Sequence, residues 1–116
     1  MELKANPVGG EAHASLANAL LARNRLDDAV AGYERALAIN PDHAEANFGL
    51  ASALHALQRH EHAIARYEKA LAIDPDYAEA NYGIATALQA LNRHDEAIRF
   101  YEKALAVDPD YTEANY

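Results

Sequence analysis

The sequence predicts an all-α fold built from repeated pairs of helices, and three observations support this prediction. Pro41, Pro75 and Pro109 are each 34 residues apart, and the residues around them repeat as well. Apolar residues recur at intervals of three and four, the spacing of one face of an α-helix. Ala, the strongest helix former, accounts for 28 of the 116 residues, whereas Trp and Cys are absent.

The 34-residue period divides the chain into three units and two short ends. The units are residues 10–43, 44–77 and 78–111. The second and third units are identical at 24 of 34 positions, and the first and second at 18 of 34. We expect residues 1–9 to be the end of a preceding repeat or an N-terminal cap, and residues 112–116 to be the start of a truncated fourth repeat.

Each unit is expected to contain two helices of about 13 residues, or roughly 20 Å. In the second unit, Leu50 and Leu54 mark the first helix, and Ile64, Tyr67 and Leu71 mark the second. The polar segment between them, QRHE, is predicted to supply a cap for the second helix.

The prolines are expected to end each second helix. Pro75 cannot continue a helix and disfavours helical geometry in the residue before it. Asp76 and Glu79 then have the D-x-x-E form of a capping box, as do Asp42 and Glu45. These aspartates are therefore predicted to start the first helix of the next unit.

Small and aromatic residues also recur at fixed places in every second helix. They are Ala29, Tyr33 and Ala36, then Ala63, Tyr67 and Ala70, then Ala97, Tyr101 and Ala104. With the closing prolines, this pattern resembles the tetratricopeptide repeat (TPR), a 34-residue helix–turn–helix unit, over 102 of the 116 residues (three times 34). The resemblance implies a right-handed superhelical solenoid of antiparallel helix pairs, whose first helices line a concave groove for extended partner peptides.

One face of each first helix is predicted to line this groove, because residues three and four apart share a face. Phe48 and Tyr82 would form an aromatic ladder rimmed by Glu45 and Glu79, which suits a peptide with apolar and basic side chains. Alternatively, the two rings pack against the next pair of helices. The candidate groove residues are Glu45, Phe48, Gly49, Ser52, His55, Glu79, Tyr82, Gly83, Thr86 and Gln89.

The two glycines of this face each cost roughly 1 kcal/mol relative to Ala inside a helix. They indicate the close approach of either a neighbouring helix or a ligand backbone. Some members of the family hold acidic chain ends with a Lys/Asn/Arg clamp on this face. Here the candidate positions hold Ala14, Asn18, Gly49, Glu79 and Gly83, so a partner that ends in acidic residues is disfavoured.

The charge balance narrows the range of partners. The chain carries 10 basic and 18 acidic residues, a net charge of −8. This balance argues against nucleic acid and against an anionic membrane surface, both of which bind clustered Lys and Arg. No run of 18 apolar residues predicts a membrane span, and the N-terminus lacks the apolar region of a signal peptide. A cytoplasmic location is the default expectation.

No pattern in the sequence predicts catalysis or a cofactor. The hydroxyls of Ser15, Ser52 and Thr86 have no acid or base in a fixed relation to them, and the glycines form no phosphate-binding loop. A cluster of three histidines, His55, His60 and His62 in the stretch HALQRHEH, does not recur as a set in the other units. A zinc site needs three or four converging ligands, so no metal site is predicted, and adventitious metal binding stays open.

Alignment of the units assigns these histidines three different roles. His60 aligns with His94 and Leu26, so both histidines are expected to pack in the turn between helices. His62 is expected to be solvated, and only His55 to face the groove.

The leading hypothesis is a non-catalytic protein-interaction scaffold that binds an extended peptide segment. A second hypothesis is self-assembly end to end through an exposed terminal surface near Tyr101, Leu105 and Tyr116, giving a homo-oligomer. A third is that the chain is the substrate-presenting arm of a larger enzyme.

Overall fold

The computed structural model describes residues 7–110, and these residues form helices and turns with no strand. The helices are α1 (Pro7–Ala22), α2 (Leu26–Ile39), α3 (Ala44–Ala56), α4 (His60–Ile73), α5 (Ala78–Ala90) and α6 (His94–Val107). The prediction of an all-α helical-repeat solenoid is confirmed. No helix within residues 7–110 is both long and apolar enough to cross a membrane.

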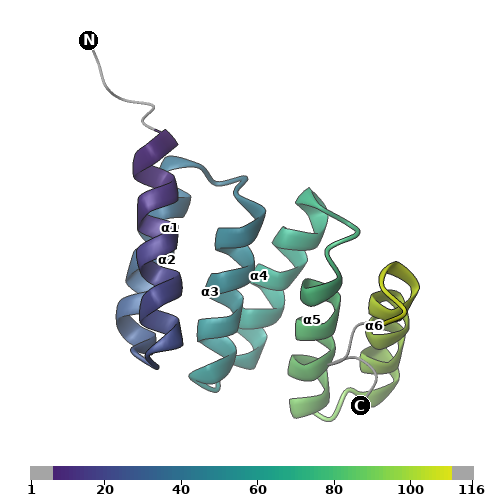
Figure 1. Cartoon of the computed structure of the whole chain (residues 1–116). Coiled ribbons are helices and arrows are strands. Elements are labelled where there is room, and N and C mark those ends of the chain that lie inside the picture. The colour runs from purple at the N-terminus through teal and green to yellow at the C-terminus, as the bar shows by residue number, and fades with distance from the viewer. Residues whose placement is uncertain (1–6, 111–116) are drawn as a thin grey trace.

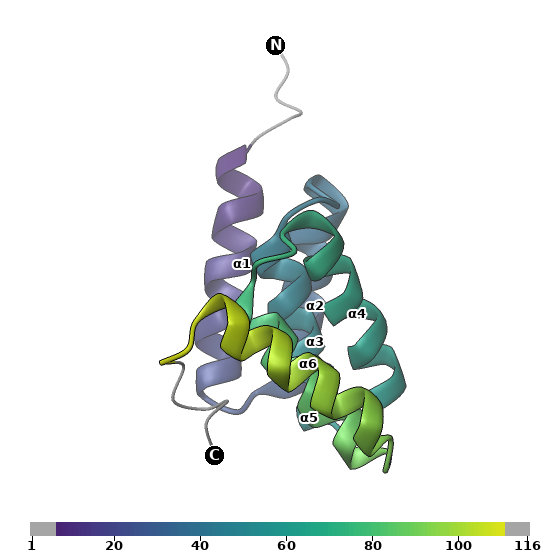
Figure 2. The same cartoon turned by 90° about the vertical axis from the view of Figure 1, so that its right-hand side faces the viewer.

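The six helices form three antiparallel pairs that lie side by side (Figure 1; Figure 2 gives the perpendicular view). The members of each pair pack tightly on one another, and α2 and α4 also pack on the first helix of the next pair. By contrast, α1 barely contacts α3, and α3 barely contacts α5. The first helices therefore stand slightly apart, with the second helix of the earlier pair behind the space between them.

Helix α1 begins before the first boundary of the repeat frame. Residues 1–9 were expected to be the end of a preceding repeat or an N-terminal cap, and residues 7–9 among them form the start of α1. Proline is favoured in the first turn of a helix, where its missing N–H needs no partner. Pro7 therefore starts a helix, whereas the aligned Pro41, 34 residues later, follows the end of α2.

Tyrosine rings over glycines hold neighbouring pairs together. Tyr33 of α2 is fully buried, and a Cβ atom on Gly49 of α3 would lie 2.3 Å from its Cζ atom. Tyr67 of α4 repeats the arrangement on Gly83 of α5, at 2.5 Å. Any larger residue would collide with the ring, so each glycine permits close approach of a neighbouring helix, one of the two alternatives left open by the sequence.

The turn inside each pair closes with a left-handed residue rather than a side-chain cap. Asn24, Gln58 and Asn92 have φ of 61°, 67° and 63°. In the second pair, the N–H of Arg59 donates to the carbonyl of Leu54 (2.8 Å) and the N–H of Gln58 donates to that of His55 (2.9 Å), a Schellman motif. The segment QRHE was expected to supply a cap for α4, but Arg59, the residue before α4, makes no side-chain cap hydrogen bond.

The predicted capping boxes between pairs are wrong. The residues that precede α3 and α5 are His43 and Tyr77, one position after the predicted aspartates. His43 caps α3 by accepting a hydrogen bond from the Ala46 N–H on Nδ1 (3.2 Å), and Tyr77 makes no side-chain cap bond. Asp76 instead donates its backbone N–H to the Asp74 carboxylate (3.1 Å), forming a local turn as soon as α4 ends.

Candidate functional site: a cleft between the first helices

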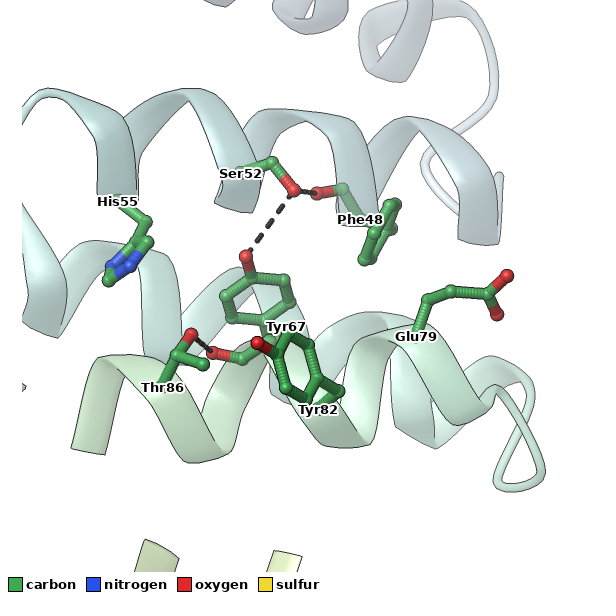
Figure 3. Close-up of a pocket in the computed structure, with 8 residues that line it drawn as sticks. Phe48, Ser52, His55, Tyr67, Glu79, Tyr82 and Thr86 are labelled. Atoms are coloured by element: carbon green, nitrogen blue, oxygen red, sulfur yellow. Dashed lines mark hydrogen bonds between the residues drawn. The ribbon is translucent and has the colours of Figure 1, made fainter. Parts of the chain in front are cut away.

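A cleft of about 400 Å³ lies between α3 and α5, where the two helices stand apart. Figure 3 shows side chains of both helices facing this space, with the ring of Tyr67 from α4 between them. The lining residues are Phe48, Ser52, His55, Tyr67, Glu79, Tyr82, Gly83 and Thr86. All of them except Tyr67 belong to the groove predicted from the sequence.

The aromatic side chains of the cleft also pack against their neighbours. The ring centroid of Phe48 lies 5.8 Å from that of Tyr67 and 5.1 Å from that of Tyr77. Tyr82 is 5.7 Å from Tyr101 of α6. These are favourable distances for tilted rings. These partners lie in the rings' own helix pairs or, for Tyr77, directly before α5, and both rings remain half-buried at the cleft.

The hydroxyl groups of the cleft are already engaged. Ser52 Oγ donates to the carbonyl of Phe48 one turn earlier (3.1 Å) and lies 3.3 Å from the hydroxyl of Tyr67. Thr86 Oγ1 donates to the carbonyl of Gly83 (2.8 Å). Burial raises the pKa of Tyr67 above its ordinary value, although the Ser52 contact opposes this shift. These groups serve as neutral polar contacts, and none is paired with a base that would activate it.

Three predicted groove residues lie outside the cleft. Gly49 is buried beneath Tyr33, as described above. Gln89 accepts a hydrogen bond on Oε1 from the hydroxyl of Tyr101 (2.7 Å). Glu45 lies one turn further along, in an adjoining hollow. The prediction took three- and four-residue spacing as its guide, and that spacing does not show which of these residues a neighbouring side chain covers or holds, as Tyr33 covers Gly49 and Tyr101 holds Gln89.

The adjoining hollow is strongly acidic and has a volume of about 700 Å³. Glu79 borders both spaces, so the acidic hollow is next to the aromatic cleft. Burial, and next the negative charges of Glu45, Glu79 and Asp74, raise the pKa of Tyr77. The lining residues are Ala44, Glu45, Asp74, Asp76, Tyr77, Ala78, Glu79, Val107 and Asp108.

Tyr67 is the cleft residue that the sequence prediction missed. It was assigned to the apolar stripe of the second helix, and it is in fact 3% exposed. Tyr67 nevertheless lines the cleft, and its hydroxyl lies near Ser52 of α3. In the preceding pair, the hydroxyl of Tyr33 similarly donates to Oδ1 of Asn18 on α1. A signal was present in the sequence, because Tyr33 and Tyr67 each precede a groove-face glycine by sixteen residues.

The structure contradicts one of the histidine assignments, that of His94. His55 borders the cleft as expected, but His60 lies against it, with a separation of 2.9 Å between the two Nδ1 atoms. His60 is half-buried, whereas His94 is exposed, so the expected packing role of His94 is wrong. His62 is exposed, as predicted. Within residues 7–110, no group of three or more His, Asp or Glu residues is arranged to hold a metal ion.

The predicted self-association end lies on α6. Tyr101 and Leu105 are half-buried there, and Tyr116 lies outside the described residues. Ile98 on the same helix is 52% exposed, whereas its counterpart Ile64 on α4 is 8% exposed. The difference arises because α5 covers the face of α4.

The family is decided by comparison of the sequence with known families. Tetratricopeptide repeats match residues 3–42 and 15–78, and a second tetratricopeptide-repeat family matches residues 56–116. The chain belongs to the tetratricopeptide repeat family. Members of this family are generally non-catalytic interaction modules. Comparison with curated proteins gave no match.

Solved TPR structures resemble this TPR array over almost its whole length. The TPR domain of Arabidopsis OM64 is 26% identical, with a TM-score of 0.93 over 95% of this chain and 91% of that chain. MamA is 28% identical, with a TM-score of 0.88 over 97% of this chain and 66% of that chain. The first TPR of Spaghetti (RPAP3), solved bound to the HSP90 peptide SRMEEVD, has a TM-score of 0.92 over 98% and 90% of the two chains. It is 22% identical, so this likeness concerns the fold.

Proposed function

We propose that this TPR array is a non-catalytic scaffold that holds an extended peptide segment in the cleft between α3 and α5. The observation that carries the proposal is the cleft itself, a concave space with half-buried rings on both walls. Aromatic side chains supply large contact areas at interfaces while losing little conformational freedom. The hydroxyls of Ser52, Tyr67 and Thr86 add polar contacts without any activated nucleophile.

The preferred peptide carries an apolar side chain followed or preceded by a basic one. The apolar side chain fits between Phe48 and Tyr82, and the basic one fits the acidic hollow that begins at Glu79. A net charge of −8 favours encounter with a cationic segment. Because both spaces border Glu79, a single extended strand would occupy them together.

Acidic peptides are expected to bind poorly. The RPAP3 domains bound to SRMEEVD support the idea that this fold holds peptides, but that peptide carries three acidic side chains. In the present chain, the groove carries Glu45 and Glu79, and the candidate positions of a Lys/Asn/Arg clamp contain neither Lys nor Arg; they hold Ala14, Asn18, Gly49, Glu79 and Gly83. Like charges across an interface disfavour binding. SRMEEVD is therefore a suitable negative control.

The test is a binding measurement with a library of extended peptides that vary in apolar and basic content. Phe48→Ala and Tyr82→Ala should each weaken the best binder about tenfold or more, equivalent to about 1.4 kcal/mol. Phe100→Ala is the matched control, since Phe100 is a half-buried ring on α6 outside the cleft and lies beneath Lys103. Circular dichroism identifies variants that fail to fold. Peptide binding that is insensitive to both cleft variants would move the site elsewhere.

Self-association is a second candidate, supported by unpaired apolar residues at the two ends of the array. Leu16 on α1 is 56% exposed, whereas its counterparts Leu50 and Ile84 are 2% and 1% exposed. Together with Ile98 on α6, it would be covered if α6 of one copy packed on α1 of another, as α4 packs on α5. Such head-to-tail contacts produce open assemblies.

One residue opposes an assembly that copies the internal register. The position aligned with Gly49 and Gly83 is Ser15 on α1, so an incoming Tyr101 ring would meet a Cβ atom. Ser15→Gly should therefore increase the average mass measured by light scattering over a concentration series, and Ile98→Ala should reduce it. If the wild-type chain and the Ser15→Gly variant both remain monomeric at high concentration, this candidate is excluded.

A further inference from the structure

The paired histidines at one end of the cleft form an arrangement that the proposed function does not use. His55 Nδ1 and His60 Nδ1 are 2.9 Å apart, and the ring centroids are 4.8 Å apart with the planes tilted by 59°. Both side chains are half-buried. Burial, together with the charge that His60 would carry, lowers the pKa of His55 and favours its neutral form.

The turn inside the second helix pair creates this contact. His55 lies in the last turn of α3, and His60 is the first residue of α4. Between them, Gln58 adopts φ of 67°, which reverses the chain and brings the start of α4 back to the end of α3. The two rings therefore belong to a hydrogen-bonded turn, so their approach is fixed by the backbone and not by side-chain motion alone.

Hydrogen bonding also determines which nitrogen of His60 is available. Nε2 of His60 lies 3.2 Å from Oε1 of Gln58. A carboxamide oxygen only accepts hydrogen bonds, so this contact favours the tautomer in which Nε2 carries the proton and Nδ1 of the neutral ring carries a lone pair. That lone pair points toward His55. A metal-binding histidine typically has the same arrangement, with its other N–H donated to a carbonyl group.

We propose that His55 and His60 bind a divalent transition-metal ion through their Nδ1 atoms. Two nitrogens that each lie 2.0–2.1 Å from a tetrahedral ion are roughly 3.3 Å apart. The present 2.9 Å separation therefore requires a small outward rotation of the rings. His55 moves its proton from Nδ1 to Nε2, a change of tautomer that leaves the ring neutral. The pair supplies two protein ligands, fewer than the three or four of a dedicated zinc site, and water fills the remaining coordination positions.

The surroundings are compatible with a bound cation. His55 lies at the carboxyl end of α3, whose partial negative charge offsets the partial positive charge at the start of α4 beside His60. The chain as a whole carries a charge of −8. Imidazole ligands suit Cu²⁺, Ni²⁺ and Zn²⁺ rather than the hard ions Mg²⁺ and Ca²⁺. The expected order of affinity is Cu²⁺ above Zn²⁺, with no saturable binding of Mg²⁺.

Calorimetric titration of the tag-free chain with Zn²⁺ tests the proposal, because it uses the metal alone and no peptide. One equivalent is expected to bind. His55→Gln and His60→Leu should each reduce the affinity at least tenfold. Both substitutions copy residues of sibling units, Gln89 and Leu26, which this fold already accommodates at the aligned positions. His62→Gln and His94→Gln are the matched controls, since both side chains are exposed and should leave Zn²⁺ binding unchanged.

A second measurement identifies the ligands directly. In ¹⁵N spectra of the imidazole groups, Zn²⁺ should shift the Nδ1 signals of His55 and His60 and leave those of His62 and His94 in place. Absence of saturable Zn²⁺ binding would overturn the proposal, as would equal binding by the wild-type chain and His55→Gln. Loss of binding in the His62 or His94 variant would show an adventitious surface site. None of these results depends on whether the cleft binds peptides.

Discussion

Helices α4 and α6 carry closely similar residues on the face directed away from the preceding helix pair, but the two faces lie in different surroundings. On α4, Ile64 and Tyr67 are 8% and 3% exposed because α5 packs over them. On α6, the aligned Ile98 is 52% exposed, and Tyr101 is half-buried. Tyr67 stands over a glycine of the next helix, whereas Tyr101 donates its hydrogen bond back to Gln89 of α5.

This difference shows that two helices can form equally well and still contribute differently to the stability of the fold. Both helices contain 14 residues and end before the same Asp-Pro-Asp sequence, so local sequence explains their extent equally well. Both helices pack on the first helix of their own pair, but only α4 also buries apolar side chains against a following helix. Removing this apolar surface from water is the favourable term that α6 lacks. In a solenoid, each such interface contributes separately to stability.

The largest expected effect is a contrast between the two aligned isoleucines. Ile64→Ala should reduce the free energy of unfolding by about 2–5 kcal/mol, since it leaves a cavity between α4 and α5. Ile98→Ala should change it by less than about 1 kcal/mol, because the side chain is already half in water. Urea unfolding followed by circular dichroism measures both. Equal losses in the two variants would mean that a further contact covers α6.

A smaller effect is expected where glycine and tyrosine meet. Gly49→Ala places a methyl group against the ring of Tyr33, which cannot move away freely because it is fully buried. Overpacking of this kind costs about 1–3 kcal/mol, and the better helix propensity of Ala offsets only part of it. Ser15→Ala at the aligned, exposed position of α1 should be neutral or slightly stabilising. Thermal unfolding of the pair decides this, and stabilisation by Gly49→Ala would show that the interface is loosely packed.

The smallest effect is expected at alkaline pH. Burial raises the pKa of Tyr33 from 10.0 to about 12. Because the folded state favours the neutral phenol, its contribution is complete below pH 10 and is lost as the pH rises from 10 toward 12. At one unit above the ordinary pKa, the loss is about 1 kcal/mol. Tyr33→Phe should abolish this part of the pH dependence of unfolding, and an unchanged pH profile in that variant would assign the effect to other groups.

Much of the fold follows from patterns within single units. The spacing of Pro41, Pro75 and Pro109 places the end of each helix pair, and the apolar positions identify which face of each helix is covered. These features depend on a helical period of 3.6 residues and on the chemistry of proline, both of which act locally. For the same reason, seven of the ten residues placed on the groove face border the cleft, and their role in binding a peptide stays a prediction.

The failed cap predictions have a different cause. Asp42 and Asp76 were expected to start the first helices, but each has its backbone N–H held by the side chain of the preceding turn, Asn40 or Asp74. The helix then begins one residue later. The boundary of such a helix depends on competition between a capping hydrogen bond and a local turn hydrogen bond, and the D-x-x-E motif describes only the capping one.

What the sequence determined by itself is the periodic part of this protein: helix positions, their apolar faces and the family. What only the tertiary structure decided is which side chains meet across helices. Tyr67 reaches the cleft because it stands over Gly83, and His60 meets His55 because Gln58 reverses the chain. Helical periodicity specifies the face on which a residue lies, whereas contact between faces depends on crossing angles, rotamers and turn geometry that arise only when the helices pack.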